Sequence, residues 1–79
     1  MKVIEINVLD VSGLGGPSLV DIKFCSNMTK ALRWAEKYIK ENYPDSFPTN
    51  WSKLSAVAKE ELLEDFEPVN FTFRRLDID

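Results

Sequence analysis

The chain has 79 residues, of which 44% are hydrophobic, and its formal net charge at pH 7 is −3. This length allows one domain, which we expect to span residues 1–79, and the apolar content is typical of a folded domain rather than a disordered chain. A single cysteine, Cys25, excludes an intramolecular disulfide, and the chain has no histidine and no cysteine cluster with which to hold zinc.

The same composition bears on the cellular location. No stretch approaches the roughly 18 apolar residues that a membrane-spanning segment needs. The first residues lack the basic segment and apolar core of a signal peptide. A lone cysteine is typical of a reducing compartment. We therefore expect a cytoplasmic protein with no membrane partner.

The first part of the chain predicts a β-hairpin. Residues 2–11 are rich in β-branched side chains with a two-residue period, which indicates a strand. The glycines and proline of residues 12–17 indicate a turn, and residues 18–25 alternate again as a second strand. The residues expected to face the rest of the core are Ile4, Ile6 and Val8 on the first strand and Val20, Ile22 and Phe24 on the second.

Residues 26–43 have the clearest helical period in the chain. Ser26 or Asn27 is expected to cap this helix, and Pro44 ends it near Asn42 because proline disfavours the α conformation in the preceding residue. One face is apolar and the opposite face is basic. The expected inner residues are Met28, Leu32, Ala35 and Ile39, and the outer residues are Lys30, Arg33, Lys37 and Lys40, with Trp34 and Tyr38 between the two faces.

The last part of the chain predicts a second helix and a third strand. The helix is expected from residue 51 or 52 to Phe66, and the sequence Glu67-Pro68 ends it. Residues 69–78 then alternate as a strand. The expected inner residues are Leu54, Val57, Ala58, Leu62 and Phe66 on the helix and Val69, Phe71 and Phe73 on the strand.

These elements predict an α+β fold. It is a two-layer sandwich in which a three-stranded sheet, with element order ββααβ and strand order 2-1-3, carries two helices on one face. If the two helices run antiparallel, the third strand emerges parallel to the first.

The residues that carry chemistry in enzymes are absent or lack partners. Without histidine there is no common general base, and no serine or threonine has a base to activate it. Cys25 is interpreted as a small apolar residue at the end of a strand, with a structural role. The glycine turn at residues 13–17 lacks the lysine of a phosphate-binding loop. The acidic residues near the end of the second helix lack the loop geometry of a calcium site. We predict no catalytic residue, no cofactor and no metal, and hence no enzyme.

Two surfaces are candidates for binding. On the sheet face away from the helices we expect an apolar patch, which is typical of an interaction site. Leu9, Val11 and Leu19 form it near the hairpin turn, and Leu76 and Ile78 join it if the third strand runs parallel to the first. The alternative is that the second helix or the C-terminal residues cover this patch within the same chain. Self-association through this face, as a homodimer, is a further expectation.

The second candidate surface is the basic face of helix 26–43. Cations bind the phosphates of nucleic acids, and aromatic rings stack on the bases. The alternative prediction is therefore a nucleic-acid-binding module that uses Lys30, Arg33, Trp34, Lys37 and Tyr38. Against this interpretation, a basic outer face is commonly only solubilising, and the two rings are equally explained by packing. The overall acidity of the chain also opposes direct binding of nucleic acid.

Charge is divided unevenly along the chain. Residues 1–40 hold six Lys/Arg and four Asp/Glu, a net charge of +2, whereas residues 41–79 hold four and nine, a net charge of −5. Glu60, Glu61 and Glu64 give the second helix an acidic surface, which either mimics a phosphate backbone toward a larger protein that handles nucleic acid or pairs with the basic helix of the same chain or of a second copy.

In size, acidity and lack of catalytic groups the chain is similar to the small inhibitor proteins of phages and mobile elements, such as anti-CRISPR and other anti-defence proteins, and to the immunity and antitoxin class. The likeness is one of build, with no diagnostic motif. It implies an inhibitor or adaptor that blocks a larger protein by steric contact.

Overall fold

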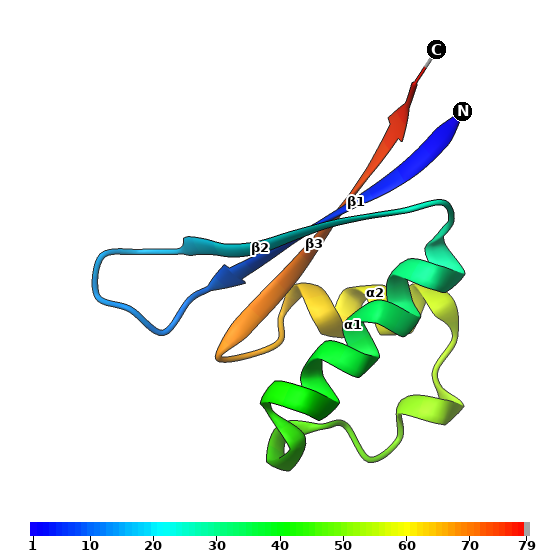
Figure 1. Ribbon diagram of the computed structural model, residues 1–79. Helices are drawn as coiled ribbons and strands as arrows, with labels where there is room; N and C mark the ends of the chain where they lie inside the picture. Colours follow the sequence, from blue (N-terminus) through cyan, green and yellow to red (C-terminus); the bar gives the residue numbers. More distant parts are fainter. Residues whose placement is uncertain (79) are drawn as a thin grey trace.

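The computed structural model describes residues 1–78, and Asp79 lies outside the described residues. These residues form three strands, two α-helices and two short 3₁₀ turns, and Figure 1 shows both helices against one face of the sheet. The α+β fold with element order ββααβ is therefore confirmed. The elements are β1 (Lys2–Asp10), β2 (Ser18–Cys25), α1 (Met28–Asn42), η1 (Pro44–Ser46), η2 (Trp51–Lys53), α2 (Ala56–Glu64) and β3 (Val69–Asp77).

The strand order β2-β1-β3 is as predicted, but the direction of β3 is not. β1 lies in the middle and pairs antiparallel with both neighbours, so the expectation that β3 runs parallel to β1 is wrong. The cause lies between the helices. The segment after α1 crosses back toward the end at which α1 begins, so α2 starts there and delivers the chain to the far end of β1 (Figure 1). Val69 consequently pairs with Asp10 rather than with Lys2.

The core lies between β1, β3 and the helices. The predicted inner residues of β1 are 0–8% exposed, and Val69 and Phe71 of β3 are 0–1% exposed. Phe73 is half-buried against the same cluster. Since alternate residues of a strand share a face, the burial of Ile4, Ile6 and Val8 fixes which side of the sheet is covered.

β2 presents the opposite face from the one predicted. Lys23 pairs with Ile6 and Ile22 pairs with Asn7, so Asp21, Lys23 and Cys25 lie on the helix side. Ile22 and Phe24 lie on the uncovered side, 45% and 55% exposed. The helices pack mainly over β1 and β3, which leaves the charged side chains of β2 in water on the helix side. Cys25, near the start of α1, is half-buried against the core, as expected of a small apolar residue.

α1 follows the predicted helix closely. The side chain of Asn27 accepts a hydrogen bond of 2.9 Å from the backbone N–H of Lys30, which satisfies one of the donors left free at a helix start. Leu32, Ala35 and Ile39 are buried, as is Ala31, and Met28 is half-buried. The helix ends at Asn42, just before Pro44.

The predicted second helix is divided in two. Trp51–Lys53 forms a 3₁₀ turn, Leu54 is extended, and α2 begins only after Ser55, whose hydroxyl accepts a hydrogen bond from the backbone N–H of Ala58 at 3.2 Å. Within this segment Trp51, Leu63 and Phe66 are the buried residues, whereas Val57 is 68% exposed. Of the predicted inner residues, Leu54, Ala58 and Leu62 are half-buried and only Phe66 is buried.

Neither α1 nor α2 has the length and apolar character of a helix that crosses a bilayer, and this holds for the described residues as a whole.

Candidate interaction surface

The side of the sheet away from the helices is called the open face here. Its residues follow from the burial of alternate positions on β1 and from the register of the two neighbouring strands. β1 contributes Val3, Glu5, Asn7 and Leu9, β2 contributes Leu19, Ile22 and Phe24, and β3 contributes Asn70, Thr72, Arg74 and Leu76.

The open face is most apolar along β2. Leu19, Val20, Ile22 and Phe24, called the β2 row, are between 45% and 55% exposed. A bulge between Val8 and Leu9 shifts the register, so that Leu9 pairs with Leu19 and Val20 is the additional residue. The shift brings Leu19 to the same face as Leu9, because a bulge inserts one residue into the alternation. Four exposed apolar side chains on one strand make a continuous row.

The centre of the open face is polar. The amide of Asn7 donates a hydrogen bond of 2.8 Å to Glu5 Oε1. Glu5 lies opposite Arg74 on one side and opposite Phe24 on the other. Asp21 and Lys23 do not join this polar group, because they lie on the helix side. The face therefore has an apolar margin along β2 and a polar centre that water can solvate.

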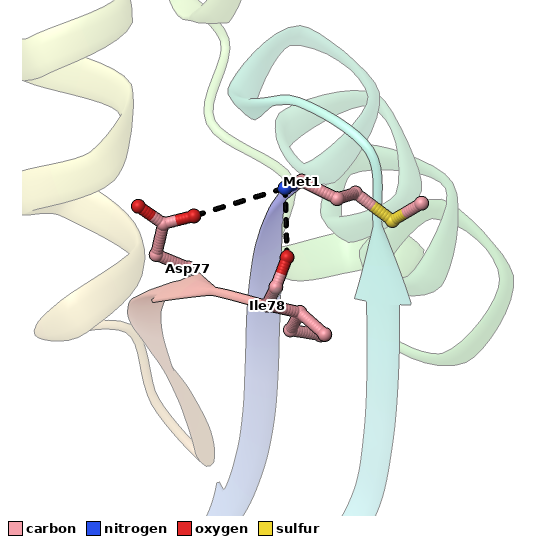
Figure 2. Close-up of polar contacts among 3 residues, drawn as sticks. All are labelled: Met1, Asp77 and Ile78. Carbon is pink, nitrogen blue, oxygen red and sulfur yellow. Dashed lines mark hydrogen bonds and ion pairs between the residues drawn. The ribbon is translucent and has the colours of Figure 1, made fainter.

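The apolar patch predicted for the open face is divided. Because β3 is antiparallel, Leu76 lies opposite Val3, at the other end of the sheet from Leu9, Val11 and Leu19. Ile78 lies at the same far end, where its backbone N–H and C=O both bond to Met1, at 2.6 Å and 2.7 Å. Figure 2 shows this contact together with Asp77, whose carboxylate is 3.8 Å from the terminal amine. Leu76 and Ile78 do not join the residues with which they were grouped.

The acidic side chains of α2 differ in their surroundings. Glu60 accepts a hydrogen bond of 3.0 Å from Arg75 Nη2 on β3, and its side chain is only 21% exposed. Glu61 and Glu64 are exposed, as are Asp65 and Glu67 beyond the helix. Within residues 1–78 the acidic helix is thus linked by an ion pair to β3 and not to the basic helix, and Glu61 and Glu64 form no ion pair there.

The basic face of α1 is partly neutralised by its own helix. Lys40 Nζ lies 3.2 Å from Glu36 and 5.0 Å from the ring centre of Phe47, and Lys37 Nζ lies 3.9 Å from Glu41. Lys30 and Arg33 are exposed and form no ion pair within residues 1–78. The positive charge of this face therefore concentrates on the first half of the helix.

The two rings of α1 are engaged in packing. Tyr38 meets Phe71 edge to face with ring centres 5.7 Å apart, and Trp34 lies 5.3 Å from Tyr38. Both rings are half-buried. Burial raises the pKa of the Tyr38 phenol above its ordinary value, and the nearby Tyr43 and Asp21 raise it further. The ring of Tyr38, which packs against Phe71, is not available for a base to stack on.

Two observations in the part of the chain that the structure describes concern clustered metal ligands and ionisable groups with shifted pKa values. No three acidic or cysteine side chains converge there as metal ligands would. The carboxylate of Asp10 accepts hydrogen bonds from the hydroxyl and the backbone N–H of Ser12, which lower its pKa, but this pair closes the hairpin turn at an exposed position.

Comparisons with protein-family models, with curated proteins and with solved structures find no match for this chain. What the molecule does must therefore be argued from the surfaces described above.

Sequence reasoning missed Val20, Ile22 and Phe24 as surface residues. Alternation divides β2 into two faces but does not state which face the helices cover. The one available signal was the pair of opposite charges at Asp21 and Lys23, and it favoured placing that face in water. The structure satisfies this preference in another way, by leaving the helix side of β2 largely uncovered.

Proposed function

We propose that this chain is a small non-catalytic interaction protein, an inhibitor or adaptor that acts by covering part of a larger protein. The observation that carries the proposal is the β2 row, in which four apolar side chains of one strand are about half exposed and three of them, Leu19, Ile22 and Phe24, lie on the open face. An exposed contiguous apolar patch beside polar residues is typical of a protein-interaction site.

The acidic residues of α2 support a partner with a basic surface. Glu61 and Glu64 are exposed, and residues 41–79 carry most of the negative charge of the chain. Opposite charge accelerates the encounter of two proteins and disfavours wrong partners. A protein that handles nucleic acid has such a surface, which fits an anti-defence, anti-CRISPR-like, immunity or antitoxin role. The lone cysteine fits the cytoplasm as the place of action.

The test uses affinity capture from the native host with the intact chain and two variants. Ile22→Glu with Phe24→Glu places two charges on the β2 row, and Val57→Glu places one on an exposed apolar position of α2. All three proteins should fold, because these side chains are 45–68% exposed. We expect one co-purifying protein with the wild type and with Val57→Glu, and its loss with the double variant. Equal capture by all three would refute the β2 row as the contact.

The charge contribution has a separate test. Glu61→Lys with Glu64→Lys should slow association with the captured partner without changing the fold, and the difference from wild type should shrink as salt is added. Glu60 is left unchanged because its ion pair with Arg75 would confound the result. An unchanged association rate would leave the open face as the whole contact.

Direct nucleic-acid binding is the second candidate function. It is favoured by Lys30 and Arg33, which are exposed beside the half-buried ring of Trp34. It is weakened by the ion pairs of Lys37 and Lys40 and by the packing of Tyr38. Gel shifts with single- and double-stranded DNA and RNA over a salt series separate the two candidates, since binding through phosphate contacts falls steeply with salt. A shift abolished by Lys30→Glu with Arg33→Glu would favour this function.

A further inference from the structure

The free edge of β2 is the feature from which a further interaction can be derived. β1 occupies one side of β2, and within residues 1–78 no strand pairs with the other side. Every residue of the strand except Cys25 is exposed, and the hairpin projects beyond the helices (Figure 1). An edge strand presents unpaired backbone N–H and C=O groups with which another strand can pair. The charges at Asp21 and Lys23 on the helix side restrict such pairing to a strand that offers the opposite charges.

The direction of the backbone groups of β2 follows from the register. In an antiparallel sheet the residues of the central strand bond alternately to its two neighbours. The backbone N–H of Val11 bonds to Pro68 and Met1 bonds to Ile78, so the odd positions of β1 face β3 and the even positions face β2. Their partners Asp21 and Lys23 are thus bonded to β1, which leaves the backbone groups of Ile22 and Phe24 directed to the free edge.

A side-chain contact agrees with this assignment. The backbone N–H of Ile22 donates to the carboxylate of Asp21, its own neighbour, at 2.8 Å. An N–H bonded within the ladder to β1 would not need this acceptor. The edge donor of Ile22 is therefore covered by a side chain that a second strand can displace.

We propose that a second copy of this chain occupies the edge, with β2 pairing antiparallel to β2 of the partner about a two-fold axis at Ile22. In this register Ile22 lies opposite Ile22 of the second copy and Val20 lies opposite Phe24. Asp21 then lies opposite Lys23, and by symmetry Lys23 lies opposite Asp21. The interface joins two pairs of opposite charge on the helix side to apolar pairs on the open face, and cross-strand pairs of both kinds are favourable.

Charge selects this register from its neighbours. A two-fold axis at Lys23 places Lys23 opposite Lys23, and an axis at Asp21 places Asp21 opposite Asp21, and like charges directly opposite are unfavourable. A shift by a single residue of one strand alone would set outward-facing backbone groups against inward-facing ones. The axis at Ile22 keeps the backbone in phase and pairs every charge of the strand.

The resulting dimer has one six-stranded sheet. A two-fold axis perpendicular to the sheet keeps both helix layers on one side, so the two β2 rows lie next to each other on the common open face. This inference does not depend on the proposed function, although a dimer would double the apolar surface that the proposed partner meets.

The test is the mass in solution over a range of protein concentrations, by sedimentation. We expect a concentration-dependent dimer for the wild type and at least about a tenfold weaker dimer for Lys23→Asp, which converts two attractive pairs into two repulsive ones. Asp21→Lys should weaken the dimer in the same way. The exchanged variant, Asp21→Lys with Lys23→Asp, restores both pairs and should restore the dimer.

Ile22→Pro is an independent variant. It removes the edge N–H but no bond to β1, so it should give a folded monomer, since proline is tolerated on edge strands. Should this variant fail to fold, the charge variants decide. A wild type that stays monomeric up to its solubility limit, or a dimer that Lys23→Asp leaves unchanged, would overturn the proposal. If the exchanged variant failed to restore the dimer, the register with the axis at Ile22 would be wrong.

Discussion

β1 and β2 are neighbouring strands of similar apolar content, but their apolar side chains differ strongly in exposure to solvent. Ile4, Ile6 and Val8 of β1 are 0–8% exposed, whereas Val20, Ile22 and Phe24 of β2 are 45–55% exposed. The difference does not come from residue type. It arises because the helices cover the even positions of β1, and the register then places Ile22 and Phe24 on the other side of the sheet.

The comparison separates two uses of apolar side chains. Burial in the core contributes to the free energy of unfolding, at about 25 cal/mol per Å² of apolar surface removed from water. A side chain left half-exposed contributes less to folding and retains surface that a partner can bury. Mutations that are matched between the two strands or their faces can therefore distinguish folding from binding.

The largest effect is expected at Phe71. Its ring is 0% exposed and contacts Tyr38 and Phe66. Phe71→Ala should lower the free energy of unfolding by about 3–5 kcal/mol, because it removes a buried ring and leaves a cavity. Phe24→Ala, at 55% exposure, should lower it by no more than about 0.5–1 kcal/mol. Urea unfolding followed by circular dichroism measures both. Equal losses would mean that β2 is packed more deeply than the structure shows.

A pair of more conservative substitutions removes one methylene group from each of the strands β1 and β2. Ile6→Val should lower the free energy of unfolding by about 0.5–1.5 kcal/mol, since Ile6 is 0% exposed. Ile22→Val should change it by less than about 0.5 kcal/mol. Both changes keep a β-branched residue, so strand preference is constant and the difference reports burial alone. The same urea titrations decide the result, and a larger loss for Ile22→Val would contradict the assignment of faces.

Much of the fold could be predicted from the sequence. The inner residues of β1, the capped apolar stripe of α1 and the strand order follow from period, capping residues and the need to cover a sheet. The face of β2 does not follow, because it depends on how far the helices extend over the sheet. The direction of β3 depends on the path of residues 43–55, and local conformational preferences in this segment do not determine at which end of the sheet the next helix begins.

The candidate site was less predictable than the core. Leu9 and Leu19 were placed together correctly, because both lie near the hairpin turn and local pairing determines their proximity. Leu76 was misplaced because its position depends on the direction of β3. In α2, adjacent Leu62 and Leu63 both suit a helical stripe, and the structure buries Leu63 and leaves Leu62 half-buried.

The ion pair between Glu60 and Arg75 connects α2 to β3, and within residues 1–78 β2 has no comparable link to a helix. A double-mutant cycle with Glu60→Ala and Arg75→Ala should give a coupling free energy of about 0.2–1 kcal/mol that falls as salt is added. The same cycle for Lys37 and Glu41, whose side chains are 74% and 61% exposed at 3.9 Å, should give a value near zero. If the coupling free energy of Lys37 and Glu41 were as large as that of Glu60 and Arg75, the ion pair between α2 and β3 would not be the stronger of the two.

The smallest effect tests the corrected face of β2 directly, through the ionisation of Tyr38. Burial raises the pKa of this phenol above its ordinary 10.0, and Asp21 contributes to the rise because its negative charge disfavours a phenolate. The contribution of the neutral phenol to stability is therefore fully present below pH 10 and is lost as pH rises through the higher pKa of the folded state.

Because only two tyrosines are present, Tyr43→Phe leaves Tyr38 as the one phenol to titrate by ultraviolet absorbance. In that background Asp21→Asn should lower the pKa of Tyr38 toward its ordinary value, since Asp21 lies on the helix side with α1. Glu5→Gln removes a charge of the same sign from the open face of the adjacent strand and should leave the titration unchanged. The opposite pattern would return Asp21 to the open face, and with it the apolar β2 row to the core.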